Sequence, residues 1–171
     1  TYIPKFIEEK SEVSGATRGN AYHRVMELLD FAHCEDVGYV FENMEALVKE
    51  KRLEENYLKL IRRDKLEHFL QSNLAKRMKM ADRAGKLFRE QPFVLGIAAN
   101  RVEKSFPEEE KVLIQGIIDA YFEEDGQIVL VDYKADAIKT PEELISRYET
   151  QVEYYKEALE KLTGKKVSES I

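Results

Sequence analysis

The sequence predicts a mixed α+β domain in which helices pack on a central sheet, and three observations support this prediction. Apolar residues recur at helical spacing through roughly the first half of the chain, and after Gly85 the pattern changes to extended, β-branched runs. Two such runs are joined by Asp125-Gly126, which is a strong hairpin signal. A long helical pattern follows the hairpin. Helices before and after a set of strands are typical of a sheet with helices on its faces.

Length and composition are those of one globular domain. The chain has 171 residues, 43% hydrophobic and 35% charged, and a chain of this size removes roughly two-thirds of its unfolded surface from water. No apolar run in it approaches the ~20 residues of a membrane span. Cys34 is its only cysteine, which excludes a disulfide framework and a cysteine-held iron–sulfur cluster and favours a reducing, cytosolic compartment. The ends at Thr1 and Ile171 indicate a fragment of a longer protein.

A helical segment is predicted over about residues 17–85. The expected helices cover residues 19–29, 42–51, 64–70 and 74–84. Thr17 and Asp64 are residue types that cap helix N-termini, and Gly85 can adopt the left-handed conformation that ends a helix.

A sheet and one long helix are predicted over about residues 86–171. The expected strands cover residues 86–102, 111–123, 128–134 and 165–171. Pro92 should lie on an edge strand or at a bend, whereas the apolar run Ile128–Val131 should be central and buried on both faces. Thr140, Pro141 and Glu143 form a capping-box pattern at the start of a helix that runs to about Leu162.

Charge is unevenly distributed along the chain. The net charge is −6, yet residues 49–89 contain 13 Lys or Arg against six Asp or Glu. These basic residues lie on segments with a helical apolar pattern, so a solvated helix face explains them as well as a phosphate-contacting surface does. An acidic total is unusual for a free-standing nucleic-acid binder.

Charged residues interrupt the two apolar runs of the predicted hairpin. Asp119 follows one run, and Asp132 and Lys134 follow the other. Burying two neighbouring carboxylates without a counter-ion would cost several kcal/mol. Mg²⁺ or Mn²⁺ would resolve this conflict, because both prefer oxygen ligands and leave positions for water and phosphate. A surface hairpin with an Asp–Lys ion pair is the alternative.

Several motifs along the chain together resemble one family. They are Gly19-x-x-x-His23, Glu90-Gln91-Pro92-Phe93, Gly116-Ile117-Ile118-Asp119, Asp132-Tyr133-Lys134-Ala135-Asp136 and Gln151-x-x-x-Tyr155. In this order they are similar to the motifs of PD-(D/E)xK nucleases, and most similar to the RecB-like branch, including its AddA type, that is fused to bacterial recombination helicases. Ala135 stands where that branch often has Thr.

The resemblance implies a fold and a set of site residues. The fold would be a restriction-endonuclease-like core with α/β/α layers, a mixed central sheet and an extra N-terminal helical segment. Mg²⁺, for which Mn²⁺ can substitute, would be held by His23, Asp119, Asp132 and the main-chain carbonyl of Tyr133. Lys134 would be catalytic, together with Asp119 and Asp132. Gln151 and Tyr155, four residues apart on one helix face, would border the site and meet the DNA. Glu90 and Asp136 would lie near the metal without binding it.

The implied function is a Mg²⁺- or Mn²⁺-dependent DNA exonuclease module of an ATP-dependent helicase–nuclease that processes double-strand breaks for recombinational repair. Its partners would be single-stranded DNA, the helicase domains of the same polypeptide and a second, AddB-like subunit, in the cytoplasm at the nucleoid. ATP would bind only in the helicase part, because the chain has no Gly-x-x-x-x-Gly-Lys loop. The alternative is a catalytically inactive DNA-binding or scaffolding module. An iron–sulfur exonuclease with the same motifs is excluded by the single cysteine.

Other residues that could carry chemistry are expected to be structural. His33 and His68 belong to no motif, and Cys34 suits a buried position. Tyr148 and Tyr154 are expected to pack against neighbouring side chains rather than to contact DNA.

Overall fold

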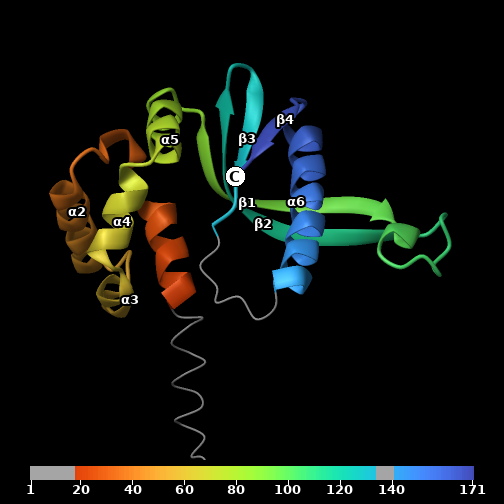
Figure 1. Cartoon of the computed structure of the whole chain (residues 1–171), viewed down its shortest axis with the longest axis horizontal. Helices are drawn as coiled ribbons and strands as arrows, with labels where there is room; N and C mark the ends of the chain where they lie inside the picture. Colours follow the sequence, from red (N-terminus) through yellow and green to blue (C-terminus); the bar gives the residue numbers. More distant parts are fainter. Residues whose placement is uncertain (1–17, 134–140) are drawn as a thin grey trace, which may run out of the picture. The chain divides into compact units, whose positions relative to one another are not determined.

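The computed structural model describes residues 18–133 and 141–171, with the backbone alone given for residues 141–148 (Figure 1). The described residues form two compact units. The helical unit comprises residues 18–87 and Tyr133, and the sheet unit comprises residues 88–132 and 141–171. No described helix combines the length and hydrophobicity needed to cross a membrane.

The helical unit is built from short helices. After a helix over residues 18–28, it contains η1 (Phe31–His33), α2 (Val37–Lys49), α3 (Glu55–Leu60), α4 (Arg63–Leu70) and α5 (Asn73–Arg83). Side chains cap two of them: Asp36 accepts a hydrogen bond from the Gly38 N–H, and Ser72 accepts one from the Ala75 N–H. Gly85, with φ of 70°, follows α5, which confirms the predicted end of that helix.

Three predictions in this unit need correction. Helix α2 begins at Val37 rather than near residue 42, because Asp36 caps it. Asp64 does not cap α4, since the N-cap residue is Arg62 and Asp64 lies in the first turn, where it binds the Arg62 guanidinium at 2.9 and 3.2 Å. Helix α3 was not predicted; it has six residues, none of them buried, so its sequence carries little apolar periodicity.

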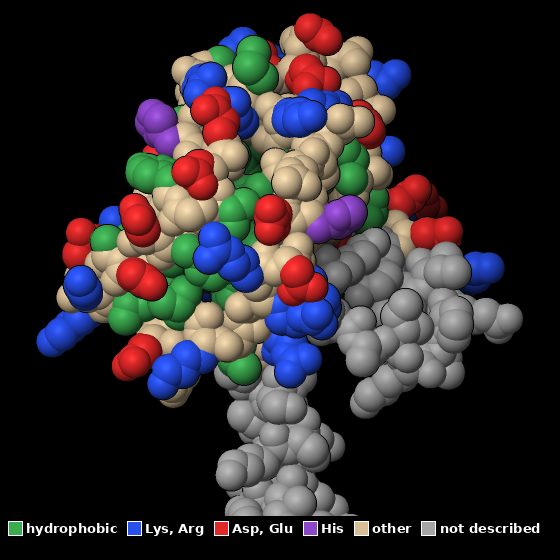
Figure 2. Space-filling view, turned by 60° about the vertical axis from the view of Figure 1, so that its left-hand side comes forward, with side chains coloured by type: hydrophobic (Ala, Val, Ile, Leu, Met, Phe, Trp, Pro, Cys, Tyr) green, Lys and Arg blue, Asp and Glu red, His purple; other side chains and the backbone are tan. Residues whose placement is uncertain are grey.

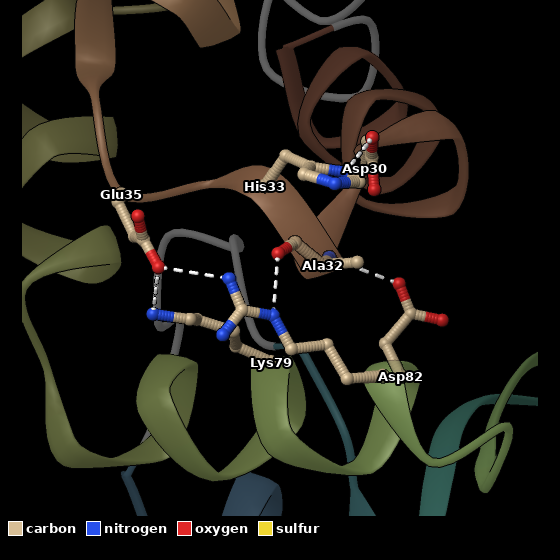
Figure 3. Close-up of polar contacts among 7 residues, drawn as sticks. Asp30, Ala32, His33, Glu35, Lys79 and Asp82 are labelled. Carbon is tan, nitrogen blue, oxygen red and sulfur yellow. Dashed lines mark hydrogen bonds and ion pairs between the residues drawn. The ribbon is translucent and has the colours of Figure 1, made fainter.

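Polar contacts hold η1 and the turn after it against α5 (Figure 3). The Ala32 N–H donates to Asp82 at 3.0 Å, and Arg83 Nε donates to the Ala32 carbonyl at 2.9 Å. Glu35 forms ion pairs with Lys79 and with Arg83. The hydrogen bond from Lys79, and then the charges of Lys79 and Arg83, lower the pKa of the Glu35 carboxyl. Two basic residues of α5 are therefore engaged within the unit.

Cys34 is 3% exposed, and burial raises the pKa of its thiol. Because the thiolate is the nucleophile, we expect iodoacetamide to alkylate Cys34 much more slowly in the native chain than in urea at pH 8. A folded pKa above the unfolded value also means that the thiol's contribution to stability is complete below about pH 8.5 and declines as the pH rises through the folded pKa. The decline is expected in urea unfolding of the wild type and not of Cys34→Ala. Equal alkylation of native and unfolded chains would contradict this prediction.

The sheet unit contains a four-stranded mixed sheet with strand order β1-β2-β3-β4. Its elements are β1 (Leu87–Ala98), η2 (Ala99–Arg101), β2 (Lys111–Glu124), β3 (Gln127–Val131), α6 (Pro141–Thr163) and β4 (Val167–Ser170). Strands β2 and β3 pair antiparallel, and β3 and β4 pair parallel, with Ile128 opposite Val167. A parallel pair requires a crossover connection, which here contains α6. The predicted α+β class with a mixed sheet is confirmed.

The hairpin between β2 and β3 has the predicted turn. Asp125 and Gly126 have φ of 54° and 76°, and positive φ at both central residues is the type I′ geometry that matches strand twist. Pro92 lies on β1, the edge strand that its missing N–H predicts. Val167–Ser170 forms the expected last strand, and its pairing continues through Ile171, whose N–H donates to the Leu130 carbonyl at 2.9 Å.

One strand is shorter than predicted. Strand β3 ends at Val131, not at Lys134, so Asp132 lies just beyond the strand although its N–H still donates to the Ile171 carbonyl at 3.0 Å. The four residues Ile128–Val131 are all buried, as predicted. A cluster between the sheet and α6 forms the core of the unit. Its buried members are Ile118, Tyr121, Ile128, Leu130, Tyr155, Leu159 and Val167.

Candidate active site

The hairpin brings Asp119 and Asp132 to corresponding positions on neighbouring strands. Ala120 lies opposite Val131, the last pair of the β2–β3 ladder. One further step in the same register places Asp132 opposite Asp119. Directly opposed residues of an antiparallel pair point to the same face, with Cβ atoms about 4.5–5.5 Å apart. Both side chains are half-buried, so the hairpin sets two carboxylates side by side at the end of its apolar run.

The two carboxylates share the face of the sheet that α6 covers. Tyr121 and Leu130, opposed two residues further along the ladder, both belong to the core cluster with Tyr155 and Leu159 of α6. Ile118 belongs to the same cluster although it is three residues from Tyr121. Strict alternation would place these two residues on opposite faces. The alternation is therefore interrupted between Ile118 and Tyr121, which allows an apolar residue and the adjacent acid to serve the same face.

Tyr155 of α6 lies close enough to both carboxylates to feel their charge. Its ring is 8% exposed, and its hydroxyl accepts a hydrogen bond from the Gln151 side-chain amide. Burial raises the pKa of the Tyr155 phenol, and the charges of Asp132 and Asp119 raise it further, whereas the bond from Gln151 opposes the shift. The phenol therefore stays neutral and can donate or accept a hydrogen bond. Gln151 and Tyr155, predicted to share a helix face, are brought together beside Asp119 and Asp132.

Glu90 lies close to Asp119. A carboxylate oxygen of Glu90 on β1 is within 4.8 Å of one of Asp119 on β2. Glu90 has φ of 50°, which is uncommon for a residue with a side chain and marks a local break in β1. Sequence analysis placed Glu90 near a metal without binding it. A geometry with carboxylate oxygens from neighbouring strands this close can hold a divalent cation.

Gly116 is required where β2 passes the ring of Phe93. A Cβ at position 116 would lie 2.8 and 2.9 Å from two ring carbons of Phe93, closer than van der Waals contact permits. The Phe93 ring cannot move away freely, because its edge packs on Tyr155 with ring centroids 5.2 Å apart. The glycine of the Gly116–Asp119 motif therefore has a packing function beside the site.

We expect Gly116→Ala to lower the free energy of unfolding by about 1–3 kcal/mol, because the new methyl group overpacks the Phe93–Tyr155 contact. Gly96→Ala is the matched control, since a Cβ at Gly96 meets nothing closer than a Leu113 methyl carbon at 3.8 Å. That control should change stability by no more than about 0.5 kcal/mol. Urea unfolding of both variants makes the comparison. Equal stability of the two variants would show that Phe93 adjusts without cost.

His23 and Tyr133 lie together in the helical unit. His23 is half-buried on the helix over residues 18–28, where Gly19 is buried one turn earlier. The rings of His23 and Tyr133 meet edge to face with centroids 6.0 Å apart, and Phe69 packs on Tyr133 from α4 at 6.5 Å. Tyr133 is bonded covalently to Asp132, so the contact ties His23 to the residue that follows an acid of the candidate site.

The remaining predicted residues divide into two groups. Lys134 and Asp136 lie outside the described residues, as do the side chain of Tyr148 and the capping residues Thr17 and Thr140. His33 pairs with Asp30 at 2.8 Å, His68 is exposed and Cys34 is buried, in line with structural roles.

Sequence analysis missed a cavity of about 380 Å³ that adjoins the site. Its described lining residues are Phe93, Ile114, Gln115, Gly116, Thr150, Gln151, Tyr154 and Tyr155. These residues belong to two strands and a helix that are distant in sequence, so no local pattern could indicate that they meet.

Comparison with known proteins identifies the family. Residues 1–170 match the family model of the PD-(D/E)XK nuclease superfamily. Proteins named as the AddA component of an ATP-dependent helicase/nuclease, from Lachnoclostridium phytofermentans, Clostridium botulinum (strain Alaska E43) and Clostridium novyi, are 36%, 37% and 35% identical over 99%, 96% and 97% of this chain. The chain spans only 15%, 14% and 14% of the length of these relatives. The chain belongs to the PD-(D/E)XK nuclease superfamily and has its mixed-sheet α+β fold.

Proposed function

We propose that the chain is a metal-dependent deoxyribonuclease that hydrolyses phosphodiester bonds at the carboxylates of the sheet unit. The observation that supports this proposal best is the arrangement of Asp119, Asp132 and Glu90. Register sets Asp132 opposite Asp119, and a Glu90 oxygen lies within 4.8 Å of Asp119. Acidic groups this close repel one another unless a cation or a shared proton balances their charge.

The donor set fits Mg²⁺ or Mn²⁺. Asp119 and Asp132 would hold the ion with carboxylate oxygens, the ligands that these hard cations prefer, and the Tyr133 carbonyl is a further oxygen in the same stretch of chain. When bound, the ion supplies positive charge for the scissile phosphate and lowers the pKa of a bound water. We extend the set to Glu90, because its oxygen is near enough to Asp119 for both acids to contribute.

His23 is proposed as the nitrogen ligand of the same ion. Its support is the Gly19-x-x-x-His23 motif and the ring contact with Tyr133, which follows Asp132 directly in the chain. Imidazole nitrogen is a good ligand for Mn²⁺ and a weaker one for Mg²⁺. Binding would then be tighter for Mn²⁺.

Lys134 and the pair Gln151–Tyr155 are proposed to act on the DNA. The Lys134 ammonium would offset negative charge that develops on the phosphate during in-line attack by water. The Gln151 amide and the neutral Tyr155 hydroxyl would hydrogen-bond the strand next to the cut phosphate, because they are already joined to each other beside Asp119 and Asp132. Asp136 is proposed to orient Lys134 or to cap the turn after it.

The basic stretch over residues 49–89 contributes less to DNA binding than its charge indicates. Lys59 pairs with Glu55, Arg62 with Asp64, and both Lys79 and Arg83 with Glu35. Figure 2 shows Lys and Arg side chains interspersed with Asp and Glu on the face that it presents. These pairs favour the solvated helix faces. Exposed cations such as Lys65, Lys76 and Lys86 are left for phosphates, so we propose moderate binding that weakens as salt rises.

The relatives' names suggest a larger assembly. We propose that the chain is the nuclease part of an ATP-dependent helicase–nuclease that trims single strands produced by unwinding at double-strand breaks, in the bacterial cytoplasm at the nucleoid. Helicase domains of the same polypeptide and a second helicase/nuclease subunit would deliver the DNA.

Calorimetry of the 171-residue chain with Mn²⁺ tests the metal site. We expect Mn²⁺ binding to the wild type and a large loss of affinity in the Asp119→Ala/Asp132→Ala double variant. Undiminished Mn²⁺ binding by the double variant would refute the assignment. Metal binding without cleavage of DNA would favour the second candidate, a DNA-binding or scaffolding module that has kept the acids of the fold.

A further inference from the structure

The cavity of about 380 Å³ between β1, β2 and α6 adjoins the candidate active site without being part of it. Figure 1 shows α6 crossing these two strands. Tyr155 and Gln151 line the cavity, and Tyr155 also feels the charges of Asp119 and Asp132. A group bound in the cavity would therefore lie beside the phosphate that the acids and Lys134 would act on.

The walls of the cavity are aromatic and fixed in place. Phe93 lies over the bare backbone of Gly116 and packs edge to face on Tyr155, with an interplanar angle of 79°. Tyr154 is held from outside by Arg101, whose guanidinium carbon lies 5.6 Å from the ring centroid. Arg101 is itself anchored by two hydrogen bonds to Glu157, at 2.9 and 3.2 Å. Rings held this way lose little conformational freedom when a ligand binds.

The chemistry of the lining selects the kind of ligand. None of the described lining residues is charged, so the cavity offers no cation to a phosphate. It offers aromatic rings together with the side-chain amides of Gln151 and Gln115. Flat, neutral rings with polar edges are the groups that stack on aromatic side chains and bond to amides, and nucleobases are of this kind. The volume falls within the about 300–1,000 Å³ of small-molecule clefts.

We propose that this cavity binds one unstacked nucleobase of the strand being cut, with Tyr154 as the ring on which the base stacks and Gln151 as a partner for its edge. The proposal rests on the proposed nuclease function and specifies its substrate. A base in the cavity cannot remain paired, so the strand must be single-stranded at the nucleotide next to the cut. Tyr154, which the sequence indicated as a packing residue, thereby becomes a substrate-positioning residue.

An abasic-site scan with the 171-residue chain tests the proposal. Single-stranded oligonucleotides, each with one abasic site, are cut in Mn²⁺, and the cleavage rate is measured at every phosphate. For the wild type we expect a loss of roughly tenfold at the one phosphate that lies a fixed number of nucleotides from the abasic site, the size of one aromatic–base stacking contact. Tyr154→Ala should slow cleavage of intact DNA by a similar factor and remove the dependence on position.

Two variants serve as controls. Tyr154→Phe keeps the ring and should keep the position-dependent loss. Tyr39→Ala removes a tyrosine that is 42% exposed in the helical unit, and it should behave as wild type. A second readout does not depend on cleavage: 2-aminopurine placed along the strand, with Ca²⁺ in place of Mn²⁺, should lose fluorescence at one position with wild type and not with Tyr154→Ala.

The outcomes separate the cavity from the nuclease function. A flat abasic profile, or a position-dependent loss that survives Tyr154→Ala, would overturn the base-binding role; a flat profile is also what a cavity filled by another part of the longer polypeptide would give. Unquenched 2-aminopurine at every position would overturn it as well. Cleavage that persists in Asp119→Ala/Asp132→Ala would instead refute the active site on which the proposal rests.

Discussion

The Asp119→Ala/Asp132→Ala double variant is expected to cut DNA at least about 10³-fold more slowly than wild type, the largest effect predicted for any change in the chain. Both carboxylates face α6 at the end of the hairpin, next to Glu90. Their loss removes the oxygens proposed to hold the cation, and a catalytic cation supplies several kcal/mol of charge stabilisation in the transition state. The measurement is the cleavage rate of single-stranded DNA in Mg²⁺ and in Mn²⁺.

The fold should survive this change, since removing two neighbouring like charges relieves repulsion. Glu149→Ala/Glu153→Ala is the matched control: both acids are exposed on α6, and their loss changes the net charge equally. The control should cut at nearly the wild-type rate. If the two double variants lose activity to the same extent, the effect is one of overall charge and the site has been assigned wrongly.

Much of the sheet unit could be predicted from local chemistry. Asp125-Gly126 fixes a type I′ turn, because few other residue pairs adopt positive φ twice in succession. The apolar run Ile128–Val131 requires burial on both faces and so predicts a central strand. The hairpin then places Asp119 opposite Asp132 by register alone. The pairing of the two acids followed from the sequence because only one turn separates their strands.

Features that depend on contacts between distant segments could not be predicted. Strand β3 ends at Val131, where the next N–H bonds to Ile171 at the far end of the chain. The interrupted alternation between Ile118 and Tyr121 serves a core shared with α6. Neither leaves a signal in its own segment, because the compensating contacts lie elsewhere.

The weight given to Glu90 shows the same limit. Its motif placed it near a metal, but the distance to Asp119 depends on a positive φ within β1, which no glycine announces. Likewise, Tyr154 resembles any half-apolar helix residue until Phe93 and Gly116 are brought opposite it. Sites assembled across strands are visible in sequence as residue types, and their roles depend on packing.

Lys134→Ala is expected to reduce cleavage of single-stranded DNA by about 10²–10³-fold while DNA binding, titrated in Ca²⁺, stays near the wild-type value. The reason is that the proposed lysine charge acts on the phosphate in the transition state, whereas the acids and His23 hold the metal, and loss of one preorganised electrostatic contact has this size of effect. Affinity for the cation should not fall and can rise, because a positive charge near it has been removed.

Two comparisons decide whether Lys134 acts in the chemical step or in binding. Lys166→Ala removes an exposed lysine before β4 and should leave cleavage unchanged. Raising the salt concentration should weaken DNA binding of wild type and of Lys134→Ala in parallel, because the phosphate contacts that release counter-ions lie elsewhere. A variant that cuts at the wild-type rate would make Lys134 an ion-pair partner of the hairpin acids. A variant that loses binding and cleavage in equal measure would make it a phosphate contact, since a group that acts only in the transition state leaves ground-state affinity intact.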